Sequence, residues 1–394
     1  MRIHKITAIV LCMLLVFVGF AACSNEPGKT DQTADNNHSS ENNDSLPNDD
    51  RDTIDTNDTP SPDNTDKDSA DPKPDDVNQS EDVPAGNMNP LTGLYDGISD
   101  EALSQRPVAI MVGNSYGGLP QWGIGDADII YEMIAEARMT RLMAIYQDYT
   151  KIVKISAVRS ARPYFIDIAQ SYGAVFVHYG GSETAVEQIA QRDDLIDIDG
   201  IKWPLEEIAF PRDADRKAQL GSEHSVYTTG ELLKVALDRQ DKSLEQTDHP
   251  SALNFADTSS AENGTPMTRV QVTFKSNHKP YFVYDEASGE YLRFQYQQEH
   301  IDGLTNEQIS VKNLLILRME LTDLDHYLDI VDITTTGTGV GYYFCEGKYV
   351  EITWKKDSYN SPINYYTLDG NEIVCKPGQT FVSVVTENTS VVIE

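Results

Sequence analysis

The 394-residue sequence predicts an α/β domain with a mixed or partly parallel sheet, followed by a smaller, mainly antiparallel β domain of the α+β kind. Residues 107–241 alternate between short apolar runs and stretches with apolar residues at helical spacing. From about residue 268 onward, apolar and polar residues alternate with period two. We therefore expect domains at 89–241 and 268–394, joined by a polar linker at 242–267.

The first domain is expected to alternate strands with helices. Its strands are expected at 107–112, 128–134, 142–146, 152–158 and 174–179, with a turn at 138–141. Its helices are expected at 164–172, 183–191 and 230–239. Pro163 suits the first turn of a helix, where its missing N–H costs nothing, and Gly173 ends that helix. This alternation favours a sheet that is at least partly parallel.

The second domain is expected to consist of a strand and three hairpins. Residues 269–274 alternate with period two. The hairpins are expected at 281–296, 342–354 and 365–375. Asp369-Gly370 and Glu346-Gly347 stand at two of the turns, and Asp-Gly between alternating runs is a strong hairpin signal.

The N-terminus predicts export followed by lipid anchoring. Arg2 and Lys5 precede an apolar run, 6–20, that is too short for a membrane-spanning helix. The run ends in Phe-Ala-Ala-Cys at Cys23, which resembles the lipobox of bacterial lipoproteins, although an aliphatic residue is more usual at Phe20. We therefore expect residues 1–23 to be a lipoprotein signal peptide and Cys23 to be lipidated at the outer face of a membrane. An ordinary signal peptide with an incidental cysteine is the alternative.

The segment after Cys23 predicts a disordered acidic spacer. Residues 24–88 contain 18 acidic and 4 basic residues and almost no aliphatic ones, so they bury too little apolar surface to fold. Such a self-repelling chain would lift the folded part off the membrane. Residues 89–394 keep a net charge of −20, which excludes nucleic acid as an expected partner.

Two cysteines remain beyond Cys23. Cys345 and Cys375 can form one disulfide bridge in an exported protein. Free thiols on neighbouring strands are the alternative, and we favour the bridge slightly. The sequence contains neither a Cys-His cluster nor a His-Glu-x-x-His pattern, so we expect no metal site and no cofactor.

Three junctions that follow expected strands carry groups suited to ligand binding. If the strands are parallel, these junctions lie along one edge of the sheet, where α/β proteins bind ligands. Arg159 and Arg162 are suited to clamping a carboxylate or phosphate, and glycines 180 and 181 let a ligand approach the backbone. The candidate ligand-binding residues are Asn114, Glu132, Arg159, Ser160, Arg162, His178, Gly180, Gly181, Ser182, Glu183 and His224.

Each candidate also has an ordinary structural explanation. The two arginines can form salt bridges with Glu132 and Glu136 instead of binding a ligand. Ser182 is equally suited to capping a helix, and His178 to a place in the core or at its rim. The sequence contains no Gly-x-Ser-x-Gly elbow, so a serine nucleophile has little support.

A family resemblance extends over residues 89–394. The segments that carry it are 89–93, 106–114, 127–132, 140–142, 158–165, 339–344, 347–348, 353–356 and 377–380, and the Arg-Ser-Ala-Arg-Pro block at 159–163 is fairly specific. These segments resemble the YerB-like lipoproteins of Gram-positive bacteria. The resemblance implies a lipidated N-terminus, a spacer, two consecutive domains of unknown function and a place in the Gram-positive cell envelope. It implies no established reaction. The chain departs from the pattern at Gly113, where Asn is more usual, and at Cys345 and Cys375.

Two functions from different classes are compatible with these residues. The first is a non-catalytic lipoprotein, anchored at the outer face of the cytoplasmic membrane through Cys23, that binds an anionic or glycan-like cell-envelope ligand or a protein partner. The second is a cell-wall-directed hydrolase in which Glu132 or Glu183 works with His178 as acid and base. The second requires that these side chains lie within hydrogen-bond reach of one another. We favour the first, since no catalytic motif is convincing.

Overall fold

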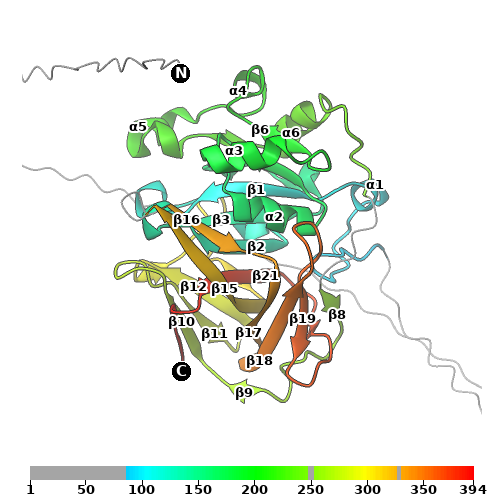
Figure 1. The fold of residues 1–394 in the computed structure, drawn as a ribbon, viewed down its shortest axis with the longest axis vertical. Helices are drawn as coiled ribbons and strands as arrows, with labels where there is room; N and C mark the ends of the chain where they lie inside the picture. The colour runs from blue at the N-terminus through cyan, green and yellow to red at the C-terminus, as the bar shows by residue number, and fades with distance from the viewer. Residues whose placement is uncertain (1–85, 247–252, 326–329) are drawn as a thin grey trace, which may run out of the picture. The chain divides into compact units, whose positions relative to one another are not determined.

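A twelve-stranded sheet runs through both sequence regions (Figure 1). Its strands are β1 (Val108–Gly113), β2 (Ile129–Ile134), β3 (Thr140–Tyr146), β5 (Val175–His178), β6 (Asp197–Asp199), β9 (Thr265–Pro266), β15 (Asn313–Asp325), β16 (Ile330–Thr334), β17 (Gly337–Cys345), β18 (Lys348–Lys356), β19 (Asn364–Thr367) and β21 (Thr380–Thr386). The order across the sheet is β19-β18-β17-β15-β21-β2-β3-β1-β5-β6, with β16 on β15 and β9 on β18.

This computed structural model describes residues 86–246, 253–325 and 330–394. The expected signal peptide, 1–23, and nearly all of the expected spacer, 24–88, lie outside the described residues. Within the described part of the chain, no helix is long and apolar enough to cross a membrane.

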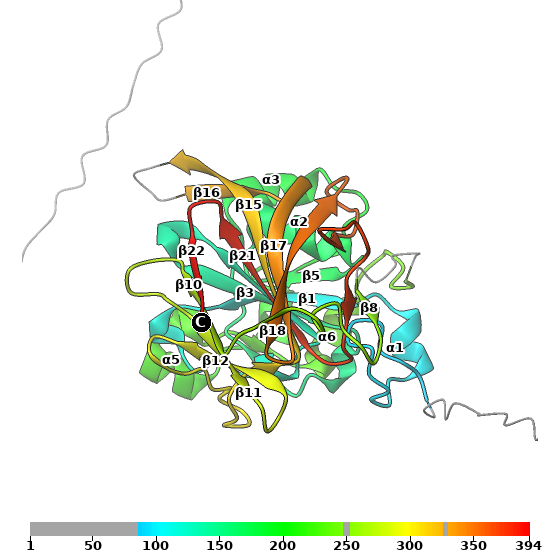
Figure 2. The same cartoon turned by 90° about the horizontal axis from the view of Figure 1, so that it is seen from below.

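Strand β21 joins the C-terminal region to the N-terminal region. It pairs in parallel with β15 on one side and with β2 on the other, from Ile129 opposite Thr380 to Glu132 opposite Ser383. Both views place this late strand inside the fold rather than at an edge of the sheet (Figures 1 and 2). The two regions therefore share one hydrogen-bonded sheet, and all described residues belong to one compact unit.

The N-terminal region has the mixed α/β sheet that the sequence predicts. β1 pairs antiparallel with β3 and in parallel with β5, and β5 pairs in parallel with β6. The helices are α1 (Asp100–Ser104), α2 (Pro163–Ser171), α3 (Glu183–Ala190), α4 (Leu205–Ile208), α5 (Ala214–Leu220) and α6 (Gly230–Leu237). Helix α2 begins at Pro163, and the chain leaves it through Gly173, whose φ of 61° suits glycine.

The C-terminal region is mainly antiparallel, as the sequence predicts. A second sheet contains β10 (Arg269–Thr273), β11 (Tyr281–Asp285), β12 (Glu290–Gln295), β13 (Gln298–Glu299), β14 (Ser310–Val311) and β22 (Ser390–Ile393). All its pairings are antiparallel, and β22 brings the C-terminus beside β10 (Figure 2). Two small pairs complete the described strands, β4 (Ile155–Ser156) with β7 (Tyr227–Thr228) and β8 (Asn254–Phe255) with β20 (Val374–Cys375). Strands β8 and β9 lie within 242–267, the segment expected to be a linker.

Three local expectations differ from the structure. The strand expected at 152–158 is reduced to β4, and Val158 bridges Val112 of β1 while its N–H donates to Val226, next to β7, at 3.0 Å. The turn expected at 138–141 ends earlier, and Thr140 already begins β3. The third hairpin is shorter than expected: an isolated bridge joins Tyr366 to Glu372, backbone hydrogen bonds flank it, and β20 then pairs with β8 instead of β19.

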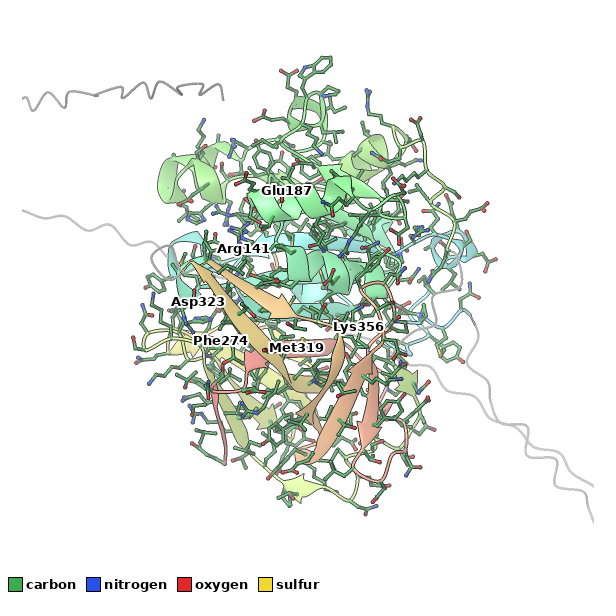
Figure 3. All side chains as sticks on the ribbon, in the orientation of Figure 1. Arg141, Glu187, Phe274, Met319, Asp323 and Lys356 are labelled. Carbon is green, nitrogen blue, oxygen red and sulfur yellow. The ribbon has the colours of Figure 1, made fainter. Side chains whose placement is uncertain are left out.

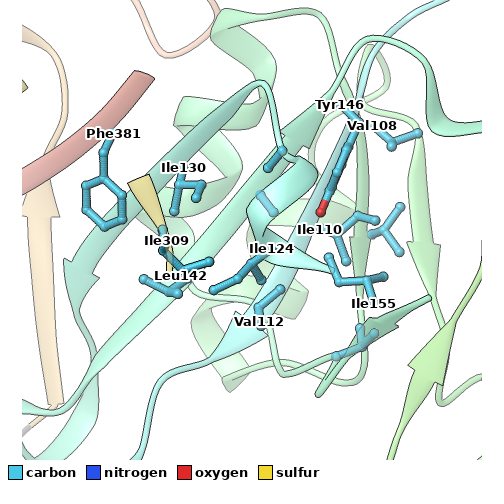
Figure 4. Close-up of a cluster of buried hydrophobic side chains, with 14 of the residues drawn as sticks. Val108, Ile110, Val112, Ile124, Ile130, Leu142, Tyr146, Ile155, Ile309 and Phe381 are labelled. Atoms are coloured by element: carbon cyan, nitrogen blue, oxygen red, sulfur yellow. The ribbon is translucent and has the colours of Figure 1, made fainter. Parts of the chain in front are cut away.

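The core packs on both faces of the large sheet. Residues of β1, β2 and β3 alternate between two buried clusters, as the period of two in a strand requires. One cluster includes Ile130 and Leu142 together with Ile309 and Phe381 from the C-terminal region (Figure 4). The other holds α2 against the opposite face. Apolar side chains from both regions therefore share one core.

The slight preference for a disulfide bridge is not supported by the structure. Cys345 and Cys375 are free thiols, and both are buried. Burial raises the pKa of both thiols, that of Cys375 to about 12, so both stay protonated at neutral pH.

Candidate ligand-binding site

The three junctions chosen from the sequence lie side by side. The Arg159 N–H donates to the carbonyl of Met111 at 2.9 Å, and the Gly113 N–H donates to that of Ala157 at 3.0 Å. On the other side, the Ala161 N–H donates to the carbonyl of Gly180 at 2.8 Å. The segment after β4 therefore lies between the ends of β1 and β5, which are parallel to each other.

A pocket of about 170 Å³ opens at this edge. Its lining residues are Gly113, Asn114, Ser115, Ala135, Glu136, Met139, Thr140, Arg141, Arg159, Glu223 and His224. Three of the candidates, Asn114, Arg159 and His224, thus line one pocket. The sequence-based reasoning missed Arg141, because it placed this residue in a turn.

Arg141 is directed to the pocket by the register of β3. It lies opposite Gly113 of β1, on the face of the sheet that carries α2 (Figure 3). Its guanidinium donates to the carbonyl of Ser160 and to Oε1 of Glu136. Arg162 donates to the other oxygen, Oε2 of Glu136, from Nε at 2.9 Å. One carboxylate therefore bridges two arginines.

The electrostatics of this cluster are dominated by cations. Burial lowers the pKa of Arg141 to about 10, with the nearby Arg162 adding to the effect, and the group stays charged at neutral pH. Burial alone would raise the pKa of Glu136, but Arg141 and Arg162 lower it overall, so this carboxylate is ionised. The side chains of Arg141 and Arg162 are 8% and 15% exposed, which makes their charges less screened than those of surface residues.

Arg159 is the second arginine that lines the pocket. Its guanidinium pairs with Glu223, NH2 to Oε2 at 3.3 Å, and the Glu223 side chain is 67% exposed. A side chain at Gly113 would begin 3.0 Å from Cγ of Arg159, so glycine leaves the room that this arginine uses. His224 packs against Gly118, and burial lowers its pKa, which favours the neutral imidazole.

Glu132 belongs to a different site. It alternates with Ile130 and Ile134 and so lies on the face of the sheet opposite to Arg141. Its carboxylate accepts from Arg293 of β12 at 2.8 Å and from His278 at 3.2 Å, and Glu132 and Arg293 are both fully buried. Burial would raise the pKa of Glu132, but Arg293 and His278 lower it to about 2.

A chain of hydrogen bonds connects this buried pair to the pocket floor. Burial, together with Arg293, holds the pKa of His300 well below its usual range, and Arg293 donates to Nδ1 of this neutral ring. His300 Nε2 donates to Gln121 at 2.8 Å, and Gln121 donates to Asn114 Oδ1 at 2.9 Å. Asn114 in turn donates to Glu132 at 3.0 Å. The chain of hydrogen bonds therefore fixes the orientation of Asn114.

Sequence reasoning missed Gln121, His278, Arg293 and His300. One readable signal existed in β12, where Arg293 and Gln295 fall on the buried phase of the strand beside Tyr291. A charged residue at a core position needs a buried partner, and Glu132 within an apolar strand is the matching signal.

The candidates around β5 have local partners. His178 is buried, and its Nε2 lies 2.5 Å from Oδ1 of Asp197 on the neighbouring β6. Ser182 caps α3, because its hydroxyl accepts from the Ala185 N–H at 3.2 Å. Glu183 is exposed in the first turn of that helix.

The remaining candidates are backbone elements of this edge. The carbonyl of Ser160 accepts from Arg141, and that of Gly180 accepts from Ala161 and contacts His178. Gly180 has a φ of 70°, a left-handed conformation that glycine adopts readily. Gly181 forms an isolated parallel bridge with Ala161.

The acid–base pair of the hydrolase hypothesis is not formed. His178 is bonded to Asp197, and the imidazole that contacts Glu132 is that of His278. Among residues 86–246, 253–325 and 330–394, no three His, Cys, Asp or Glu side chains are grouped so as to hold a metal ion.

Comparison with known proteins identifies the family. Residues 91–243 match the N-terminal domain, and residues 270–382 the C-terminal domain, of a protein of unknown function, DUF3048. "Putative lipoprotein YerB" of Bacillus subtilis strain 168 is 28% identical over 306 residues, which cover 75% of this chain and 85% of YerB. The crystal structure of the YerB protein from Bacillus subtilis matches with a TM-score of 0.66 and 26% identity, covering 78% of this chain and 99% of that one. The chain belongs to the YerB-like family and contains two consecutive domains of unknown function.

Proposed function

We propose that this protein is a lipoprotein anchored through Cys23 to the outer face of the cytoplasmic membrane, where it binds an anionic ligand of the cell envelope without catalysing a reaction. The lipobox-like end of residues 1–23 and the similarity to a protein described as a lipoprotein support the anchoring. The acidic stretch that follows Cys23 supports a position away from the membrane surface.

The observation that carries the binding proposal is the grouping of three arginines at one pocket. Arg141 and Arg159 line it, and Arg162 lies behind it, in contact with the lining residue Glu136. Among the described residues, their guanidinium groups form ion pairs with two carboxylates, Glu136 and Glu223. A cluster of cations is unusual on a folded part with a net charge of −20, and guanidinium forks match carboxylate and phosphate oxygens. The pocket is therefore suited to an anionic group of a glycan, a peptide or a polymer of the envelope.

A binding role agrees better with this geometry than a hydrolytic one. In the pocket the polar groups of Asn114 and Thr140 are engaged with each other and with Glu132. The neutral His224 has Glu223 as its carboxylate neighbour, at 3.3 Å, and that side chain is largely in solvent. The pocket thus offers cations in fixed positions and no activated nucleophile.

Calorimetric titration of the purified protein with muropeptides, teichoic-acid fragments and inorganic phosphate tests the proposal. We expect binding by the wild type and a loss of about tenfold or more in affinity for Arg159→Ala plus Arg162→Ala, because each removes a charged hydrogen-bond donor. Arg269→Ala is the matched control, since Arg269 also forms a partly exposed ion pair, with Glu394, but does not line the pocket. Undiminished affinity in the double variant would rule out this site.

A further inference from the structure

Glu136 already occupies the position that an anionic ligand would take. Its two carboxylate oxygens are divided between two arginines, Oε1 toward Arg141 and Oε2 toward Arg162. Each oxygen thus accepts charge-assisted hydrogen bonds from a different guanidinium, so one planar carboxylate bridges the two arginines. The carboxylate is supplied by the protein itself, from the turn between β2 and β3.

The turn that carries Glu136 is strained and partly exposed. Ala137 and Arg138 both have a φ of 55°, a left-handed conformation that side chains with a Cβ disfavour. Lys275 holds the turn through the carbonyl of Ala137, at 3.0 Å. The Glu136 side chain remains 33% exposed. It can therefore swing toward solvent without unpacking the apolar core.

Glu136 cannot leave the cluster unless another anion replaces it. Arg141 is 8% exposed, and a buried guanidinium without a counter-ion is strongly unfavourable. Departure of Glu136 and arrival of a ligand carboxylate would keep the number of charges in the cluster constant.

We infer that Glu136 is an internal substitute for the carboxylate of a small ligand, and that binding displaces it from Arg141 and Arg162. This inference rests on the proposed function and narrows its ligand to a carboxylate-bearing molecule, such as one with a free peptide C-terminus. The adjoining pocket accommodates the rest of the ligand, with Met139, 42% exposed, as an apolar wall. Free phosphate shares the charge but not the planar two-oxygen geometry.

Titration of the Glu136→Gln variant with N-acetyl-alanine and with inorganic phosphate tests the inference. We expect N-acetyl-alanine to bind about tenfold more tightly than to the wild type, because the neutral amide competes less well for the arginines. The affinity for phosphate should rise by a smaller factor. Glu346→Gln is the matched control, since Glu346 is 36% exposed, forms an ion pair with Lys376 and also lies at a turn with positive φ. The Glu346→Gln variant should bind N-acetyl-alanine with the affinity of the wild type.

Glu136→Asp keeps the charge while shortening the side chain, so it provides a second variant if the glutamine variant does not fold. It should also bind N-acetyl-alanine more tightly than the wild type. Anion binding that is equal in the wild type and both variants overturns the displacement but leaves the proposed function intact. A gain for phosphate alone overturns the carboxylate class. Absence of anion binding in the wild type and in every variant refutes the proposed function itself.

Discussion

Removing Arg293 should destabilise the protein strongly, because it would leave Glu132 as a buried charge without its main partner. Both side chains are fully buried, and they join β2 of the N-terminal region to β12 of the C-terminal region. Breaking a buried pair from one side typically costs about 3–5 kcal/mol. We therefore expect Arg293→Met to lower the free energy of unfolding by about 3–5 kcal/mol.

The pKa of Glu132 gives an independent magnitude. It falls from an ordinary value of 4.5 to about 2, and each unit corresponds to about 1.4 kcal/mol, so ionisation of Glu132 contributes roughly 3 kcal/mol. Because the pKa is lowered in the folded state, this contribution is present above pH 4.5 and is lost as the pH falls toward 2. Arg293→Met should flatten this part of the pH dependence.

Urea unfolding at pH 7 and at about pH 2.5, followed by circular dichroism, measures both effects, because the Glu132 contribution is lost between pH 4.5 and about 2. Replacing both partners with apolar residues, Glu132→Leu plus Arg293→Met, should cost clearly less than the sum of the two single changes. Arg269→Met serves as the control, since its ion pair with Glu394 is partly exposed and should contribute less than about 1 kcal/mol. A loss of less than about 1 kcal/mol for Arg293→Met, or additive single changes, would refute this reasoning.

Three further predictions concern other parts of the fold. Burial raises the pKa of Asp128 to about 6, so stability should fall as the pH rises from 4 to 6, and Asp128→Asn should remove this slope in thermal melts; a slope unchanged by the substitution would contradict it. Ser182→Ala should cost about 1 kcal/mol in urea unfolding, since it removes the cap of α3, whereas Ser182→Gly should cost only a few tenths. In the chain without residues 1–23, Cys345 and Cys375 should react with a thiol reagent only after unfolding; absence of thiols in the unfolded chain would show a bridge.

The elements that the sequence predicts well are those specified locally. Helix α2 follows from Pro163 and Gly173, and the turn at 346–347 has the positive φ angles at both residues that such a hairpin favours. Strands β15 and β21 were not anticipated, although both are rich in apolar residues. Parallel pairing of β21 with β2 joins segments about 250 residues apart, and a pattern read along the chain does not specify such partners.

Only the part of the candidate site that lies within one short segment could be predicted from the sequence. Arg159 and Arg162 share one short segment, and this segment lies at the expected edge of the sheet. Arg141 joins the cluster because β3 begins at Thr140. The sequence pattern placed Arg141 in the preceding turn, so its direction toward the cluster could not be predicted. Glu132 was assigned to the wrong neighbours, because its partners Arg293 and His278 come from the other region of the chain.

The affinity of Arg141→Lys for N-acetyl-alanine, measured by calorimetric titration beside the wild type, tests the central claim most directly. Lysine keeps the positive charge in the pocket but lacks the guanidinium that donates at once to the Ser160 carbonyl and to a carboxylate. If the arginine cluster is the binding site, the wild type binds and the variant loses about tenfold or more in affinity. Equal affinities, in variants with the same melting temperature, would show that the ligand does not bind at these arginines.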